Sequence, residues 1–524
     1  MNPIVQTLPL VISMPMSGFM AHHPLLAQII PLMIALPLGA AFLTALAGPG
    51  CRRLPEMICG VATFALTLLS FWAVSAARVE GFIDYPMGGW RQPAGVHLVL
   101  DGLSAFMLVP VNGIAFLVAL YSIDYMRRFT SSWQFHCLLL LMIAGMNGVI
   151  LTGDVFNLFV FLEVAAVASY GLVAFGVGRH ELEAAFKYGV MGTLGSLCVL
   201  LAIALLYGAA STLNMADMAI YLAEYPAPHL TLLAATLFIL GFGMKAALVP
   251  FHAWIPDAHP SAPAPISAML SGVLIKALGI YALVRVLFNV LGLTPALSEV
   301  LMCLGTLSMM VGVFLAIGQW DLKRLLAYHS ISQVGYVVLA IGLGTPLGLL
   351  AGLFHLFNHS VFKALLFLNS GAIEYATGTR DLKQMGGLAA RMPVTHLTTL
   401  SASMSIAGVP PFNGFWSKLL IILAAVQAGR YGYATWAVIG SVLTLASFLK
   451  VMRYAFNGPL PERLANIREV PFAMQFSMAV LALICLTGGL LLLPGLADQF
   501  LQPASEALGA GRVYATQLLE KIPQ

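Results

Sequence analysis

Charged residues are scarce in this chain. Only 9% of its 524 residues are charged, whereas 60% are hydrophobic, and the mean hydropathy is +0.92. Soluble globular domains carry about 25% charged residues, so the composition excludes that class. The formal net charge of +4 indicates how basic loops are distributed around a membrane rather than binding to nucleic acid.

The chain also lacks the motifs that hold metals, clusters and nucleotides. Its six cysteines include no Cys-x-x-Cys pair, which argues against an iron–sulfur cluster, a structural zinc or a disulfide framework. No His-Glu-x-x-His motif and no glycine-rich phosphate loop occurs. We therefore expect no cofactor and no metal, and any energy for transport must come from outside the chain.

Apolar runs of the length that crosses a bilayer, about 20 residues, recur along almost the whole sequence. We count about fourteen, near 25–48, 57–77, 101–123, 135–153, 154–177, 184–208, 230–256, 262–288, 296–318, 325–343, 347–375, 393–427, 432–455 and 470–493. The predicted fold class is an all-α integral membrane protein with about fourteen transmembrane helices.

Arginine and lysine predict the orientation, because short cytoplasmic loops carry an excess of both. The odd-numbered loops hold Arg52, Arg53, Arg127, Arg128, Arg179, Lys323, Arg324, Arg380, Lys383, Arg391, Arg453, Arg463 and Arg468. The even-numbered loops hold little beyond Arg78, Arg91 and Arg430. Both termini are therefore expected on the outer, periplasmic side of the inner (plasma) membrane.

Two segments do not follow the pattern of membrane helices. Residues 1–24 are apolar but lack a basic region at their start, so we expect an apolar extension rather than a cleaved signal peptide. The stretch "RVEGFIDYPMGGWRQPAGVHLVL", residues 78–100, contains Gly-Gly, proline and alternating apolar residues. That pattern predicts an extracellular hairpin or flap.

Ionisable residues within the predicted helices are the strongest functional signal. A charged side chain at the bilayer centre costs about 2.5–3.5 kcal/mol on the gentlest scale, so such residues normally face a protein interior or a hydrated path. Eight fall there: Glu163, Lys187, Lys245, Lys276, His355, His359, Lys363 and Lys418. Together they predict buried pairs or a hydrated route.

Some of these residues have simpler interpretations. Lys187 follows Glu183 by four residues and can form an ordinary pair on a helix surface. Lys363 lies toward the end of its run and can extend to the membrane surface. Glu163 has no charged neighbour within eight residues, which favours a functional role.

Two histidines and a lysine share one stripe of a helix in "HLFNHSVFKALLFL". His355, His359 and Lys363 are spaced at i, i+4 and i+8, which places neighbours about 5–6 Å apart. Proton transfer requires titratable groups within hydrogen-bond reach, directly or through water. The stripe predicts a proton relay, with ordinary core histidines as the alternative.

Two proline-containing segments interrupt predicted helices beside a lysine. Pro250 follows Lys245 in "KAALVPFHAWIPDAH", and Pro411 precedes Lys418 in "AGVPPFNGFWSK". Proline breaks a helix, and irregular backbone at membrane depth marks ion sites in transporters. We expect freed carbonyls to hold water beside each lysine, and the two breaks predict an internal repeat.

The predicted divisions follow from these observations. They are an apolar extension (1–24), helices 1–3 with an extracellular flap (25–134), a first repeat (135–288), a second repeat (289–456), and helix 14 with a C-terminal tail (457–524).

These motifs, together with "DLKRLLAYHSISQVGY", resemble the antiporter-like membrane subunits shared by respiratory complex I, Mrp-type multisubunit cation/proton antiporters and membrane-bound hydrogenases. The resemblance covers roughly residues 101–456. It implies a fourteen-helix core with two inverted five-helix repeats, each containing a broken helix. It also implies a chain of buried charged residues along the membrane midplane and other membrane subunits as partners.

By matching position, the resemblance implies roles for six residues. Glu163 and Lys245 match a glutamate–lysine pair on the fifth and seventh helices, and Lys276 matches the central lysine of the eighth. His355 and His359 match histidines of the eleventh helix. Lys418 matches the residue on the twelfth helix at which the path ends. Gln333 stands where some relatives carry histidine, and Lys418 where some carry glutamate. Lys187, Gln333 and Lys363 are additional candidates for the path.

The resemblance implies a proton-translocating subunit driven by a partner module, itself non-catalytic but part of an oxidoreductase complex such as a quinone oxidoreductase or hydrogenase. Alternatives are a subunit of an Mrp-type Na⁺/H⁺ antiporter, a stand-alone cation/proton antiporter, a quinone-reducing subunit and a membrane scaffold. A lysine-rich path favours protons over sodium, because fixed positive charge repels a metal cation.

Overall fold

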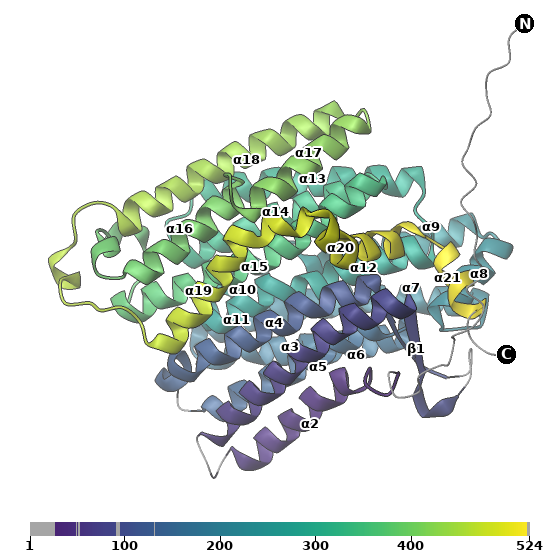
Figure 1. The fold of residues 1–524 in the computed structure, drawn as a ribbon, viewed down its shortest axis with the longest axis horizontal. Helices are drawn as coiled ribbons and strands as arrows, with labels where there is room; N and C mark the ends of the chain where they lie inside the picture. Colours follow the sequence, from purple (N-terminus) through teal and green to yellow (C-terminus); the bar gives the residue numbers. More distant parts are fainter. Residues whose placement is uncertain (1–26, 49, 51–52, 91–94, 130, 521–524) are drawn as a thin grey trace, which may run out of the picture.

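The computed structural model describes residues 27–520 except 49, 51–52, 91–94 and 130. The expected extension over 1–24, together with Cys51, Arg52 and Arg91, lies outside the described residues. Long helices pack side by side with tilted axes into one bundle (Figure 1). The chain is an all-helical, multi-pass membrane protein by the length and composition of these helices.

The long α-helices follow the predicted apolar runs, and shorter helices lie between and after them. They are α2 (Leu32–Ala47), α3 (Leu54–Glu80), α4 (Gly102–Tyr125), α5 (Ser132–Leu151), α6 (Val155–Val173), α7 (Arg179–Ala210), α8 (Met215–Glu224), α9 (Pro228–Ala246), α10 (Ile255–Ser261), α11 (Ala264–Met269), α12 (Ala282–Val284), α13 (Pro295–Ile317), α14 (Leu322–Gly342), α15 (Pro346–Thr377), α16 (Pro393–Ala407), α17 (Asn413–Gln427), α18 (Tyr431–Val451), α19 (Phe472–Thr487), α20 (Pro494–Gly509) and α21 (Val513–Glu520). π-Helical segments are η4 (Leu270–Tyr281), η5 (Arg285–Val290) and η8 (Met452–Phe456).

Within the described part of the chain, 12 helices are long and apolar enough to cross a membrane. The helices α2 and α17 are apolar but shorter. The sequence-based count of about fourteen is therefore higher than the number that meets the length criterion. The difference arises because the helix in the first predicted run, α2, has only 16 residues, and another run is split into α16 and α17 of 15 residues each.

The helices at the centre of the bundle are buried on every side. Almost all residues of α14, α15 and the 264–290 segment are buried, whereas α3, α7, α18 and α19 expose large hydrophobic side chains. The exposed hydrophobic side chains of the outer helices are suited to contact lipid. A helix that is buried on every side contacts only protein. Polar groups on the central helices therefore face protein.

The predicted hairpin is confirmed. Strands β1 (Phe82–Pro86) and β2 (His97–Asp101) pair antiparallel, and Phe82 lies opposite Asp101. Asp101 caps α4 by accepting the Ser104 backbone N–H at 2.8 Å, and its carboxylate lies 2.8 Å from the buried Arg285 guanidinium. The hairpin is thus fixed to the helical core by an ion pair.

The predicted C-terminal tail is more ordered than the sequence indicated. Helix α20 packs on α4 and α15, and α21 packs on α8; α20 and α21 are drawn in yellow in Figure 1. The sequence did not reveal these helices because each is shorter than the run that crosses a bilayer.

Two connections interrupt helices where proline was noted. Helix α9 ends at Ala246 and helical structure resumes at Ile255, and Pro250 lies in the intervening turn. Helix α16 ends at Ala407 and α17 begins at Asn413, with Pro411 between them. The Val249–Pro250 and Pro410–Pro411 peptide bonds are both cis.

Candidate functional site

Glu163 on α6 and Lys245 on α9 meet in space. The Lys245 Nζ lies 3.4 Å from Glu163 Oε1 and 3.4 Å from the Tyr170 hydroxyl. The Ser196 hydroxyl donates to the same Glu163 oxygen. The lysine side chain is 3% exposed and the glutamate side chain 29%. Two charges that are 82 positions apart in the sequence thus form a partly buried pair.

The end of α9 positions Lys245. The lysine lies in the last helical turn, where a positive charge interacts favourably with unpaired carbonyls. Ala247 ends the helix with a positive φ of 55°. The Trp254 indole N–H donates to the Met244 carbonyl at 3.0 Å, and the Leu248 N–H donates to the Gly243 carbonyl at 2.9 Å. Protein groups therefore occupy the carbonyls of Gly243 and Met244, and the water expected at the remaining carbonyls of this break stays a prediction.

Lys276 lies in the middle of η4 rather than on a regular α-helix. Its side chain is fully buried, and its Nζ donates to the Ser271 carbonyl. A Cβ built on Gly279 would lie 2.6 Å from the Ala246 Cβ, so glycine permits η4 to approach the end of α9 closely. Within the described residues, no hydrogen bond or ion pair joins Lys245 to Lys276.

His355 and His359 stack along α15. Their ring centroids are 6.3 Å apart with an interplanar angle of 19°. His355 Nδ1 lies 2.9 Å from the Ser417 hydroxyl, whereas neither ring nitrogen of His359 has a hydrogen-bond partner among the described residues. The charges of Lys276 and Lys418 both act on each ring. Both histidines are therefore within electrostatic range of the central lysine and of the lysine of α17.

Lys418 bridges the second helix break. Its Nζ donates to the Ile406 carbonyl, in the last turn of α16, at 2.7 Å and to the Ser441 hydroxyl at 3.4 Å. The same ammonium lies 4.8 Å from the centroid of the Tyr336 ring, which in turn packs on His355. The Lys418 ammonium therefore contacts one carbonyl at this break, and the water expected there stays a prediction.

The three additional candidates differ in position. Lys363 is fully buried and donates to the Leu326 carbonyl at 2.5 Å, so it does not extend to the membrane surface. Gln333 is buried, and its side-chain amide has no partner in the described structure. Lys187 is 47% exposed and pairs with Glu183 and Asp257 at 2.9 Å. Lys187 therefore forms the expected pair with Glu183 on the helix surface, and its role on the path stays a prediction.

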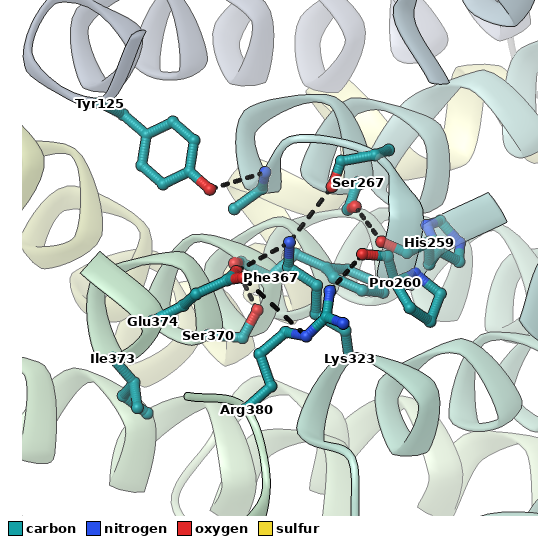
Figure 2. A network of polar contacts seen from close by, with 12 residues as sticks. Tyr125, His259, Pro260, Ser267, Lys323, Phe367, Ser370, Ile373, Glu374 and Arg380 are labelled. Carbon is teal, nitrogen blue, oxygen red and sulfur yellow. Dashed lines mark hydrogen bonds and ion pairs between the residues drawn. The ribbon is translucent and has the colours of Figure 1, made fainter. Parts of the chain in front are cut away.

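Besides the Asp101–Arg285 pair, sequence analysis also missed an ion pair between α14 and α15. Lys323 on α14 and Glu374 on α15 lie 3.0 Å apart, Nζ to Oε2, next to Arg380 and the buried His259 (Figure 2). The sequence marks Lys323 only as a basic loop residue. Its position directly after the predicted loop, beside a helix-capping aspartate, gives no signal of burial.

The chemistry of the assembled side chains is that of proton carriers. Amines, imidazoles and carboxylates take up and release protons. In the described part of the chain, no three histidine, cysteine, aspartate or glutamate side chains are grouped so that they could hold a metal ion. Lys276, the two histidines and Lys418 are therefore groups of the kind that a proton relay uses.

Comparisons with known proteins agree with this geometry. Residues 152–444 match the family described as NADH:quinone oxidoreductase/Mrp antiporter, TM, and residues 92–136 match the family described as NADH-Ubiquinone oxidoreductase (complex I), chain 5 N-terminus. The first match covers more than half of the chain and contains all six candidate path residues.

Individual relatives cover most of the chain. An NADH-quinone oxidoreductase subunit of Desulforudis audaxviator is 36% identical over 461 residues, 86% of this chain and 90% of the relative. An Na(+)/H(+) antiporter subunit of Alkalihalophilus pseudofirmus is 35% identical over 408 residues, 78% of this chain and 83% of the relative. One protein of the Mrp complex from Dietzia sp. superposes with a TM-score of 0.87 at 29% identity, over 94% of this chain and 99% of that one.

Proposed function

Because the chain belongs to the family of NADH:quinone oxidoreductase/Mrp antiporter membrane subunits, we propose that it translocates protons within a multisubunit membrane complex. The six path residues are Glu163, Lys245, Lys276, His355, His359 and Lys418. A partner module supplies the energy, since the chain carries no motif for a redox centre or a nucleotide. Membrane subunits of a complex I-like, hydrogenase or Mrp assembly are the partners that the family suggests.

The observation that carries the proposal is the row of buried basic groups. Lys276, the two histidines and Lys418 are all buried, and each histidine is within electrostatic range of both lysines. Burying so many ionisable groups in a membrane protein is costly unless they serve a pathway. A scaffold has no use for them.

The exchange starts at Glu163 and Lys245. A buried lysine loses affinity for its proton when it is desolvated and regains affinity when a carboxylate is near. When Glu163 approaches, Lys245 is held in its charged form. When Glu163 moves away, Lys245 passes its proton, or its electrostatic effect, to Lys276. The histidines then carry the proton to Lys418.

Water completes the path where side chains do not touch. Buried polar atoms are nearly always hydrogen-bonded to protein or to ordered water. Neither the His359 ring nor the Gln333 amide has a protein partner among the described residues. These unpaired atoms support a hydrated connection between η4 and α15.

The proposed architecture has fourteen membrane crossings. It adds α2 and the broken α16–α17 unit to the 12 long helices, and it pairs 135–288 with 289–456 as inverted five-helix repeats. Each repeat contains one break, at Pro250 and Pro411. The segment 25–134 carries helices 1–3 with the flap, and 457–524 carries helix 14 and the C-terminal helices. The termini lie on the periplasmic side, as the basic loops suggest.

A sodium-linked assembly is the second candidate. The relative in Alkalihalophilus pseudofirmus is named as part of an Na(+)/H(+) antiporter, and the superposed protein comes from an Mrp complex. In a stand-alone cation/proton antiporter, the chain would work without partners. Proton movement that requires sodium would favour these alternatives over a redox-driven complex.

The test uses inverted vesicles from a strain that lacks the native chain and expresses the wild-type chain or a Glu163→Gln variant. We expect proton translocation in sodium-free buffer to fall about tenfold or more in the variant, because a positioned proton-transfer group contributes at least this much. Amounts of assembled complex are matched by native electrophoresis.

The control is Glu299→Gln. Glu299 pairs with Arg430 at the start of α13 and is 43% exposed, so its loss should leave translocation unchanged. Full translocation by Glu163→Gln would contradict the proposed function.

A further inference from the structure

A polar cavity opens on one face of the bundle, next to the first helix break. Its volume is about 360 Å³, and charged side chains from four segments line it, including Glu183, Lys187, Asp257, Asp321, Arg324 and Arg380. We call this cavity the vestibule. Its basic residues belong to loops that the distribution of arginine and lysine places on the cytoplasmic side. The vestibule thus offers water and charge at the edge of the membrane domain.

Arg380 connects the vestibule to the interior. Its Nε lies 3.3 Å from Asp321 Oδ2 and 3.9 Å from Glu374 Oε1, and its Nη1 donates to the Pro260 carbonyl. The arginine side chain thus lines the vestibule and also contacts Glu374, and Figure 2 shows these two residues beside each other.

Lys323 lies below Glu374 and is buried more deeply. The Lys323 side chain is 2% exposed, whereas Glu374 is 26% exposed. Besides the 3.0 Å contact with Glu374, Nζ donates to the Ala262 carbonyl at 3.1 Å. Glu374 is thus the more solvent-accessible member of the pair, and Lys323 lies in the core.

His259 is within electrostatic range of Lys323 and of the central lysines. It is fully buried against Phe367, with ring centroids 4.6 Å apart, and neither ring nitrogen has a partner in the described residues. The charges of Lys323, Lys276 and Lys363 all act on its ring. An imidazole with both nitrogens free can accept a proton on one side and donate on the other.

A purely structural role explains this arrangement less well. Buried ion pairs contribute little net stability, and apolar residues often replace them without loss. A structural clasp between α14 and α15 also gives no reason for an unpaired imidazole on the side of the central lysines.

We propose that Glu374, Lys323 and His259 form an uptake branch that delivers protons from the vestibule to Lys276. This inference rests on the proposed proton translocation and adds the route by which one face supplies it. Arg380 is a positioning residue that holds Glu374 at the opening.

Each turn of the branch conserves protons and charge. The Lys323 ammonium gives one proton, directly or through water, to a nitrogen of His259, which passes a proton from its other nitrogen toward Lys276. The neutral Lys323 amine then takes a proton from water of the vestibule by way of the Glu374 carboxyl group. The ion pair is restored, and one proton has left the vestibule.

The test compares Lys323→Arg, Lys323→Ala and Glu374→Gln in inverted vesicles at matched amounts of assembled complex. Arginine keeps the charge but does not release its proton. Glutamine keeps the shape of glutamate but carries no exchangeable carboxyl proton. We expect each variant to lower proton translocation about tenfold or more.

Lys450→Arg is the matched control. Lys450 is a half-buried lysine whose Nζ donates only to the carbonyls of Ile317 and Gln319 among the described residues, at 2.7 and 2.6 Å. Arginine at position 450 should donate to the same carbonyls, so we expect the Lys450→Arg variant to translocate protons at the wild-type rate.

The outcomes separate the branch from the function on which it rests. If Glu163→Gln blocks translocation but either Lys323→Arg or Glu374→Gln retains more than about half, the uptake branch is wrong and the proposed function stands. If Glu163→Gln also retains full translocation, the proposed function itself fails. A steric effect of arginine alone would leave Glu374→Gln active, and that result also overturns the branch.

Discussion

Glu163 is held less tightly than the lysine it contacts. Its side chain is 29% exposed on α6, whereas that of Lys245 is 3% exposed. A carboxylate at membrane depth needs a polar or protein neighbour, so we expect a partner protein to cover this edge. The freedom of the glutamate and the confinement of the lysine suit a switch in which the carboxylate moves.

If the two residues act as one unit, losses should not add. We expect Glu163→Gln and Lys245→Ala each to reduce proton translocation about tenfold or more, and the double variant to be no worse than either single variant. Proton translocation is measured in vesicles with the wild-type chain, the two single variants and the double variant, which shows whether the two losses are independent. Multiplied losses in the double variant would show that the residues act separately.

At the residue scale, the sequence alone identifies a candidate charged residue where that residue stands apart from other charges or beside a helix-breaking proline. Glu163 stands alone in an apolar run, and Lys245 precedes a proline, so both could be selected without a structure. Lys323 and Glu374 could not, because each lies near a helix end, where charge is ordinary. Only the packing of α14 against α15 brings them together in the interior.

At the level of elements, the break after α9 presents Lys245 at a helix end. Three contacts fix the geometry around it. The Trp254 indole N–H donates to the Met244 carbonyl, and the Trp254 ring stacks on the Tyr188 ring with centroids 4.1 Å apart. The Val249 N–H donates to the Ser308 hydroxyl at 3.0 Å. The break is therefore a packed structure rather than an unwound segment.

Pro250→Ala should weaken this arrangement by allowing helical hydrogen bonding to extend past Ala246. We expect the chain to insert and assemble normally but to translocate protons about tenfold more slowly, because Lys245 loses its position at a helix end. Proton uptake by vesicles and a structure of the variant are the measurements.

Pro295→Ala is the control for this substitution, since Pro295 occupies the first turn of α13, where proline causes no break. A continuous helix in Pro250→Ala together with normal proton flux would remove the argument for the break.

The elements were predictable as far as hydropathy determines them. Each predicted apolar run lies over a helix, and the hairpin formed where glycine and proline indicated it. The π-helical form of η4 was not predictable, because it depends on packing against α9, α11 and α15 rather than on residue periodicity. The two C-terminal helices were missed because their short amphipathic runs do not resemble membrane spans.

For the whole molecule, the positions of the charged groups outline a route across the core. The Glu163–Lys245 pair lies between α6 and α9. In our proposal the uptake branch runs from the vestibule toward η4, the histidines of α15 lead to Lys418, and the parts of the route meet at Lys276. The sequence pointed to the members of the main path, but their order and proximity follow from tertiary packing.

The account depends most directly on whether Lys276 releases its proton. Lys276→Ala removes the group, and Lys276→Arg keeps its charge but does not deprotonate. Proton translocation is measured in vesicles that contain equal amounts of assembled complex. The account predicts that both variants lose about tenfold or more of the wild-type rate. Substantial translocation by Lys276→Arg would contradict it, because a lysine needed only as a fixed positive charge would be replaced by arginine.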